Sequence, residues 1–466
     1  MNPSPRPLEL PPLTRLSPRV QVALELTRAA FELVLLPIRL GRFLVQRPKL
    51  AAEVRELLAR PPGAIPDPPP IPVSRERLRV FVACAEPSGE IHAVNLVHAL
   101  LDRARQLGLP EPEFRGLGGP RLAALGVKTL ADPVTNSTMG LRVLGALPFY
   151  LRLLRDSAAV FGEERPQIVI GVDSPALHVP LFRLAKRSGI PAVHFVTPQY
   201  WGWGPWRTSK YRRAVDLGLS ILPFESEWFQ NRGVLSKHIG HPLLDELRDV
   251  PNSERAPARE RLVLLAGSRG SVLGRNLSWI LNLAAKFLER HPSAEVVLAQ
   301  GRSEWAEQMR GELEAADPRI RLEIGDLHGS LRGARAAVSV SGTILLDLLH
   351  HRLPTVVVYR LGSRFEAWLA TRILSVPYFA VINLLTGEET CPEFCFAGDG
   401  PQEQALEALE SLWAAGPPRE ACLAGLERAA ERLGPPGAVG RAAHWALAVA
   451  ARVEIPPADV NSEQEP

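Results

Sequence analysis

A lone carboxylate follows a predicted buried strand in the middle of the chain. The stretch "IVIGVDSPALHVPLF", residues 168–182, opens with apolar residues, and Asp173 comes directly after them. Such an acid serves either as a helix cap or as a general base within reach of a substrate hydroxyl. The carboxyl end of a strand in an open α/β sheet is where ligands bind, which suits the second role. This stretch alone leaves both interpretations open.

A second polar cluster, "AEPSGEIHA" at residues 85–93, follows another predicted strand. Glu86 and Ser88 lie where a helix should begin, and the free backbone N–H groups of a helix start point outward. Simple N-capping by Ser88 accounts for the same pattern. The cluster therefore gains weight only in combination with other strand ends.

An aromatic and basic segment, "TPQYWGWGPWRTSKYRRA", occupies residues 197–214. Its glycines and proline favour a loop over a packed element. Aromatic rings beside cations suit a sugar ring, an acyl chain and a phosphate, so Trp201, Trp203 and Arg207 are candidate acceptor or lipid contacts. Packing in the core is the alternative role for the tryptophans.

Two later strand ends carry small polar residues, in "LLAGSRG" (264–270) and "SVSGTILLD" (339–347). Small residues let backbone N–H groups approach a phosphate, and an arginine neutralises its charge. An acid one turn into the helix suits ribose hydroxyls, although helix capping explains the second cluster equally well. The pattern G-x-x-x-x-G-K is missing, so neither is a Walker loop. The candidates for nucleotide binding are Gly267, Ser268, Arg269, Ser341, Gly342, Thr343 and Asp347.

Predicted strands and helices alternate along the chain. Their apolar residues do not alternate with polar ones, which is typical of parallel strands buried on both faces. Two such runs predict an α/β protein with two doubly wound, Rossmann-like domains facing across a cleft. Strands are expected at 78–85, 167–173, 191–198, 216–223, 261–267, 294–300, 336–342 and 354–360, and helices at 91–106, 176–188, 276–291 and 344–351.

Composition shifts mark the domain boundaries. We expect a helical extension at 1–60, a proline-rich linker at 61–74, domains at 75–250 and 258–400, helices at 401–453 and a disordered tail at 454–466. Pro37 and Pro48 should break the extension into pieces. Its apolar residues and interspersed arginines suit an interfacial membrane helix, or else a helical hairpin packed on the body.

Composition excludes several classes of protein. The 466 residues exceed one ordinary core, and a net charge of +4 does not suggest a nucleic-acid partner. Four cysteines are too few for a disulfide framework, and the spacing of Cys391 and Cys395 does not predict a zinc site. No secretory signal is evident, and the apolar stretch 29–38 is too short to span a bilayer. These features favour a cytoplasmic protein.

Taken in order, the motifs resemble those of the lipid-A-disaccharide synthase family, bacterial glycosyltransferases with the two-domain GT-B architecture. The resemblance runs from about Arg79 to Gly398. It is carried by "AEPSGE", "GGPRLAALG" (118–126), "TMGLRVLG" (138–145), "GVDSPALH" (171–178), "HFVTPQYWGW" (194–203), "LPFE" (222–225), "GHPLLDEL" (240–247), "AGSRG" (266–270), "SGTILLD" (341–347) and "INLLTGEETCPEF" (382–394).

The resemblance implies an inverting transfer that needs no metal or other cofactor. The donor would be UDP-2,3-diacylglucosamine, the acceptor 2,3-diacylglucosamine 1-phosphate, and the products a β-1,6-linked disaccharide and UDP. Asp173 matches the essential acid of the family, and Glu86 and Ser88 match its active-site loop. Arg269, Ser341, Gly342, Thr343 and Asn383 fall on positions expected to hold UDP. Acylated substrates imply a peripheral location on the cytoplasmic face of the inner membrane, with a homodimer as one possible assembly.

Several residues depart from the family pattern. Val272 replaces an expected acid, Asp347 a glutamate, Phe396 a glutamine, and His178 stands where asparagine is frequent. The first 75 residues have no usual counterpart. A related transferase that uses another UDP-sugar or lipid acceptor, and a non-catalytic membrane-associated relative, therefore remain alternatives. A nucleotide-sugar 2-epimerase would share the architecture but would need neither the extension nor the aromatic loop.

Overall fold

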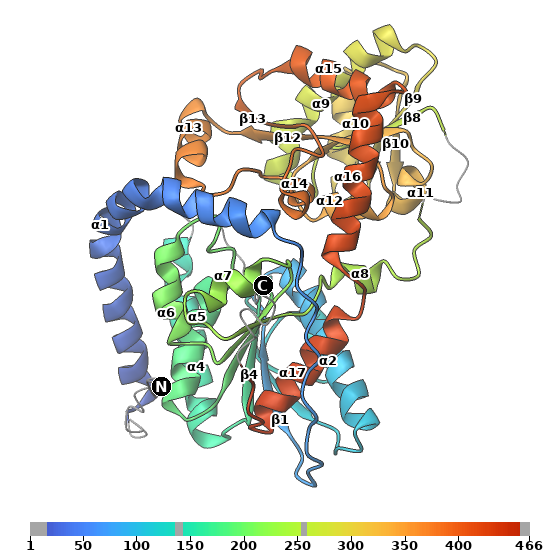
Figure 1. The fold of residues 1–466 in the computed structure, drawn as a ribbon. Coiled ribbons are helices and arrows are strands. Elements are labelled where there is room, and N and C mark those ends of the chain that lie inside the picture. The colour runs from blue at the N-terminus through green and yellow to red at the C-terminus, as the bar shows by residue number, and fades with distance from the viewer. Residues whose placement is uncertain (1–15, 136–142, 253–258, 457–466) are drawn as a thin grey trace, which may run out of the picture. The chain divides into compact units, whose positions relative to one another are not determined.

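The chain folds into two compact units, which the computed structural model describes over residues 16–135, 143–252 and 259–456 (Figure 1). Unit 1 is built from residues 1–45, 64–242 and 437–466, and unit 2 from 46–63 and 243–436. Most of the motif at 138–145 and most of the tail predicted at 454–466 lie outside the described residues.

The described part of unit 1 holds a seven-stranded parallel sheet in the order β3-β2-β1-β4-β5-β6-β7. The inner strands are short runs of apolar residues that are buried on both faces, as their sequences predict. Strand order reverses between β1 and β4, which is the topological switch point of the sheet. The strands are β1 (Arg79–Ala83), β2 (Glu113–Leu117), β3 (Lys128–Ala131), β4 (Ile168–Val172), β5 (Ala192–Phe195), β6 (Leu217–Ser220) and β7 (Ser236–His238).

Helices cover this sheet, and the last one comes from the end of the chain. Trp445 and its apolar neighbours in α17 (Ala438–Ala450) join the core formed by β1, β4 and α2 (Pro87–Gln106). The C-terminal helices predicted at 401–453 are thus divided, since α15 and α16 belong to unit 2. The remaining helices of unit 1 are α3 (Pro120–Ala124), α4 (Val143–Glu163), α5 (Pro175–Arg187), α6 (Thr208–Arg212) and α7 (Glu225–Gln230).

The described part of unit 2 holds a six-stranded parallel sheet in the order β10-β9-β8-β11-β12-β13, with its switch point between β8 and β11. The strands are β8 (Arg261–Leu265), β9 (Glu295–Gln300), β10 (Ile320–Ile324), β11 (Ala336–Val340), β12 (Thr355–Leu361) and β13 (Glu393–Ala397). The helices are α8 (Leu243–Glu246), α9 (Gly270–Arg290), α10 (Ala306–Glu314), α11 (Leu327–Leu331), α12 (Ile344–His350), α13 (Arg364–Ile373), α14 (Val381–Thr386), α15 (Gln402–Trp413) and α16 (Pro417–Leu433).

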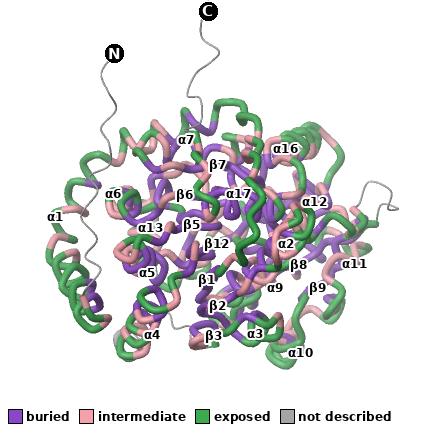
Figure 2. Tube along the Cα trace, turned by 90° about the horizontal axis from the view of Figure 1, so that it is seen from below, coloured by how far each residue is buried: buried purple, intermediate pink, exposed green. Residues whose placement is uncertain are grey.

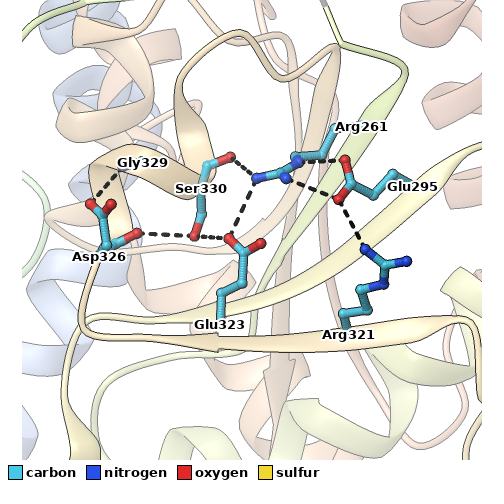
Figure 3. Close-up of polar contacts among 7 residues, drawn as sticks. All are labelled: Arg261, Glu295, Arg321, Glu323, Asp326, Gly329 and Ser330. Atoms are coloured by element: carbon cyan, nitrogen blue, oxygen red, sulfur yellow. Dashed lines mark hydrogen bonds and ion pairs between the residues drawn. The ribbon is translucent and has the colours of Figure 1, made fainter.

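A buried arginine ties neighbouring strands of unit 2 together (Figure 3). The guanidinium of Arg261, at the start of β8, makes two 2.9 Å hydrogen bonds to the carboxylate of Glu295 on β9. It also lies 3.4 Å from Glu323 on β10, whose carboxylate accepts a 2.6 Å hydrogen bond from the Ser330 hydroxyl. This pairing lowers the pKa of Glu295 through its hydrogen bonds to Arg261. Arg261 and Glu295 begin β8 and β9, whereas the candidate nucleotide loops follow the ends of β8 and β11.

The predicted N-terminal extension is one long helix, α1 (Pro18–Ala59). The expectation that Pro37 and Pro48 break it is wrong, because the helix runs through both residues. A proline within a helix costs one hydrogen bond and crowds a carbonyl, and tertiary packing can offset that cost. Here Phe43, between the two prolines, and Val54, after the second, are buried. No described helix has the length and apolar character needed to cross a bilayer.

The predicted fold class, two Rossmann-like parallel α/β domains with an N-terminal helical extension, is confirmed by this architecture. Each predicted strand is present, with ends that shift by at most three residues. Both candidate loops of each unit follow the two strands that flank its switch point. The fold thereby places the chemistry-bearing residues at the carboxyl edges of the two sheets.

Candidate active site

Two acidic loops meet at the switch point of unit 1. Glu86 follows β1 and Asp173 follows β4, and these two strands are paired neighbours. The Ser174 hydroxyl lies 3.5 Å from a carboxylate oxygen of Glu86. A Cβ added to Gly89 would lie 3.8 Å from the Cβ of Asp173, so the start of α2 comes close to this acid. Sequence reasoning predicted Glu86, Ser88 and Asp173 as one site, and the fold gathers their two loops.

The backbone at this acid adopts an uncommon conformation. Asp173 has φ +57° and Ser174 has φ +41°, both in the left-handed region that non-glycine residues rarely enter. Each such residue costs on the order of 1–3 kcal/mol and persists only where its surroundings enforce it. This conformation turns the chain sharply between β4 and α5. Asp173 is half-buried at the edge of the sheet.

Two buried histidines hold this turn. The Nε2–H of His194, on β5, donates a 2.7 Å hydrogen bond to the Asp173 carbonyl oxygen. The Nδ1–H of His178, on α5, donates to the same oxygen. Gly171 leaves room for this arrangement, since a Cβ there would lie 2.7 Å from the His178 ring. Both donors therefore converge on the residue that carries the candidate base.

Burial keeps the two imidazoles neutral. It lowers the pKa of His178 to about 4 and that of His194 to about 3. The Tyr211 hydroxyl lies 3.0 Å from His194 Nδ1 and donates to it, which leaves the Nε2 proton for Asp173. Sequence reasoning missed His194 and Tyr211 as site residues. The available signal was a histidine inside an otherwise apolar strand next to the one that ends at Asp173.

The aromatic loop divides into a buried part and an exposed part. Trp201 is buried, and its Nε1–H donates a 2.9 Å hydrogen bond to Glu225, whose pKa burial raises to about 7. This is the packing role that the sequence left open for the tryptophans. Trp203 is 43% exposed, and the Arg207 guanidinium stacks 4.1 Å from the centre of its ring. Only Trp203 and Arg207 of the predicted acceptor contacts are thus presented to solvent.

The loop after β8 forms the first half of the candidate nucleotide site in unit 2. Gly267 has φ +113°, a conformation that suits glycine alone, and a Cβ there would meet the Val272 side chain at 2.7 Å. The Trp305 Nε1–H donates a 3.0 Å hydrogen bond to the Ser268 carbonyl oxygen and fixes the loop. Arg269 is exposed and extended directly before α9, so its side chain is available to an anion.

The loop after β11 forms the second half. Ser341 is half-buried, while Gly342, with φ +153°, and Thr343 are exposed. Asp347 follows on α12, and burial raises the pKa of its carboxyl to about 7. Its carboxylate lies 3.7 Å from the His328 Nε2. The predicted ribose contact is thus a carboxyl that titrates near neutrality.

Two residues flagged on the donor side have structural partners. Asn383 is buried, and its side-chain amide bonds the backbone of Cys391 in both directions, at 2.8 Å, and also the Glu393 carboxylate. Phe396 packs 4.7 Å from the Trp279 ring. Both residues therefore shape the region around β13 rather than projecting into solvent. Among the described residues, no group of three or more His, Cys, Asp or Glu side chains is arranged to hold a metal ion.

Comparison with known proteins gives strong sequence similarity. Residues 80–416 match the family described as lipid-A-disaccharide synthetase. The chain is 34% identical over 380 residues to the lipid-A-disaccharide synthase of Myxococcus xanthus, covering 79% of this chain and 97% of that protein. It is also 34% identical over 329 residues to the Pseudomonas paraeruginosa enzyme of the same name, covering 68% and 85%.

Comparison with solved structures gives the fold. A putative UDP-N-acetylglucosamine 2-epimerase from Listeria monocytogenes matches with a TM-score of 0.52 and 16% identity, covering 78% of this chain and 94% of that one. At that identity the likeness concerns architecture alone. Helix α1 lies outside the residues that the family match covers.

Proposed function

The chain belongs to the lipid-A-disaccharide synthase family, and from this premise we propose that it transfers diacylglucosamine from UDP-2,3-diacylglucosamine to 2,3-diacylglucosamine 1-phosphate. The products are the β-1,6-linked lipid A disaccharide and UDP. The observation that carries the proposal is that the loops carrying Glu86 and Asp173 come together at the switch point of unit 1 in a chain of this family.

Asp173 is the proposed general base. Its carboxylate takes the proton of the acceptor 6-hydroxyl while that oxygen bonds to the anomeric carbon of the donor sugar. The bond between that carbon and the diphosphate breaks, and UDP leaves with the electron pair. Attack opposite the leaving group inverts the anomeric centre. The enforced turn at Asp173 and Ser174 supports this role because it holds the carboxylate ready without reorganisation.

UDP is assigned to unit 2. Arg269, at the start of α9, pairs with the diphosphate, and the exposed backbone of Gly342 and Thr343 offers close approach to it. The Asp347 carboxyl accepts a hydrogen bond from a ribose hydroxyl when it is ionised, and can donate one when it is protonated. Trp203 and Arg207 of unit 1 are proposed to contact the acceptor, since a guanidinium on an aromatic face suits a phosphorylated sugar.

We further propose that the protein works at the cytoplasmic face of the inner membrane as a peripheral protein. Both proposed substrates carry acyl chains that partition into lipid. An enzyme that joins two such molecules must reach the bilayer surface.

The reaction is tested with the purified chain, UDP-2,3-diacylglucosamine and 2,3-diacylglucosamine 1-phosphate in detergent micelles. Mass spectrometry should detect the disaccharide and NMR its β-anomeric proton, while Asp173→Asn supplies the matched inactive control. Replacing the donor by UDP-N-acetylglucosamine separates this activity from that of a transferase for simpler sugars. Absence of disaccharide with wild-type protein that binds UDP would refute the proposed substrates.

A further inference from the structure

Helix α1 exposes apolar residues on more than one side, including Leu33, and six of those in unit 1 form a row along one side. Within unit 1 this row comprises Val20, Leu24, Phe31, Val34, Ile38 and Val45, which recur at intervals of three, four and seven residues. Such spacing places them along one face of a helix. Four of them leave 60% or more of their surface exposed, up to 82% for Val45. Figure 2 shows most of this helix coloured as exposed.

The opposite side of the same stretch packs on unit 1. Glu25 is buried and pairs with Arg183 and Arg187 of α5, at 2.6 and 2.5 Å. Phe43 is buried and meets the Trp206 ring edge-on, with 5.2 Å between ring centres. These contacts fix which side of the helix faces the protein. The contacts of Glu25 and Phe43 with unit 1 thus leave the apolar row on the outer side of the helix.

Charge is distributed unequally between the two sides. The acids between residues 18 and 45 are Glu25 and Glu32 alone, and both pair with arginines or a lysine on the side that faces the protein. Arg19 and Arg42 are exposed along the outer side. The outer face therefore combines large apolar side chains with positive charge and carries no acid.

We propose that the outer face of residues 18–45 in α1 binds the surface of an anionic lipid bilayer. This proposal deepens the proposed membrane location and rests on it. A helix lying in the interface buries its apolar side chains at the level of the acyl-chain boundary, while its cations meet lipid phosphates. An interface with a second copy of this chain would bring two positively charged faces together, so an anionic bilayer is the occupant that the charges favour.

Flotation of the full-length protein with vesicles tests the proposal, using phosphatidylcholine vesicles with and without about one-third phosphatidylglycerol. The triple variant Phe31→Gln/Val34→Gln/Ile38→Gln should lose at least tenfold in apparent affinity for the anionic vesicles. Arg19→Gln/Arg42→Gln should lose affinity for anionic vesicles selectively, and high salt should reproduce that loss. Val73→Gln/Leu147→Gln, which alters exposed apolar residues outside α1, is the matched control and should float as wild type.

Flotation is measured without substrates, so it does not depend on whether the proposed transfer takes place. Thermal melting and UDP binding of each variant check that the fold is kept. We expect both to match wild type, since the changed side chains are exposed. If the triple variant floats as well as wild type, the proposal is overturned. It is equally overturned if light scattering shows that the triple substitution turns a dimer into a monomer while flotation is unchanged, because the face then joins two copies.

Discussion

The Nε2 atom of His194 lies 2.7 Å from the carbonyl oxygen of Asp173, and its N–H donates a hydrogen bond to that oxygen. His178 donates to the same oxygen from α5. A carbonyl that accepts two buried donors is fixed in direction, and here it belongs to a residue with φ +57°. The energy of these two bonds offsets part of the strain of the turn. We therefore regard both histidines as positioning residues for the Asp173 carboxylate.

Two substitutions of His178 should distinguish the effect of its hydrogen bond from the effect of its imidazole ring. His178→Asn can still donate to the Asp173 carbonyl and should keep turnover within a few-fold of wild type. His178→Ala removes the donor, and we expect kcat to fall about tenfold or more while the Kd for UDP is unchanged. Steady-state kinetics with UDP calorimetry checks this split, with rates corrected for folded fraction by circular dichroism. Equal kcat values for the two variants would remove the positioning role.

Asp173→Asn should preserve the fold and abolish the base. The amide keeps the size and capping ability of the carboxylate, so melting temperature and UDP affinity should remain near wild type. General-base catalysis contributes about 10²–10⁴-fold, and kcat should fall by that factor. Near-normal turnover would show that Asp173 only caps α5, and Glu86, 3.5 Å from the Ser174 hydroxyl, would become the candidate base.

Arg269→Ala should weaken binding of UDP. Loss of a hydrogen bond to a charged group costs about 1.5–3 kcal/mol, which corresponds to roughly a tenfold or greater rise in Kd. Isothermal titration calorimetry measures it, and binding of uridine, which lacks the diphosphate, serves as the control that should not change. An unaltered Kd for UDP would place the diphosphate elsewhere.

Acid should destabilise the protein because several histidines are buried in the neutral form. Burial lowers the pKa from 6.5 to about 4 or below in five of them, His178, His194, His238, His241 and His351. The unfolded chain therefore binds more protons between about pH 6.5 and 4, and stability falls as the pH falls through that window. Three carboxyls whose pKa is raised by burial, those of Glu225, Asp347 and Glu393, act in the opposite direction.

Urea denaturation at several pH values measures this dependence, and the midpoint should drop steadily between pH 7 and pH 4. Replacing His178 by Asn removes one titrating group and should flatten the slope. A midpoint that is constant or rises on acidification would contradict the assignment of neutral histidines.

Arg261→Ala should destabilise unit 2. The substitution leaves the carboxylates of Glu295 and Glu323 without their shared guanidinium, which is 9% exposed. Because both carboxylates are about one-third exposed, water screens part of the effect, and we expect a loss of about 2 kcal/mol. Arg321→Ala is the control, since that arginine is 75% exposed and lies 3.8 Å from Glu295, and its loss should cost less than about 0.5 kcal/mol. Equal unfolding midpoints for the two variants would contradict the role of the network.

The inner strands of both sheets could be predicted from the sequence because burial on both faces leaves uninterrupted apolar runs, as in β4 and β8. The strands that sequence reasoning missed are edge strands or their neighbours. The β10 sequence, "IRLEI", mixes charged and apolar residues, and β7 has three residues. Such short or mixed segments gain their strand conformation from the neighbour with which they pair, which local periodicity does not reveal.

The candidate site was predictable where residues follow a strand, as Glu86, Asp173 and Arg269 do, because strand ends meet at one edge of a parallel sheet. The roles of Trp201 and Asn383 could not be predicted, since a buried partner decides whether such a side chain faces solvent. Residues that act through the backbone were harder still. His194 contacts Asp173 from the next strand, and sequence spacing alone does not reveal a hydrogen bond to a carbonyl.

Unit 1 draws on three separate stretches of the polypeptide, and α17, which ends at Ala450, completes its core beside α2. The ribosome therefore synthesises all of unit 2 before the last part of unit 1 exists. During that interval the apolar surface of α2 and its neighbours is not covered by α17. Chaperones would be most needed in this period. For the same reason, a premature stop codon that removes only the final thirty residues should damage the domain encoded first.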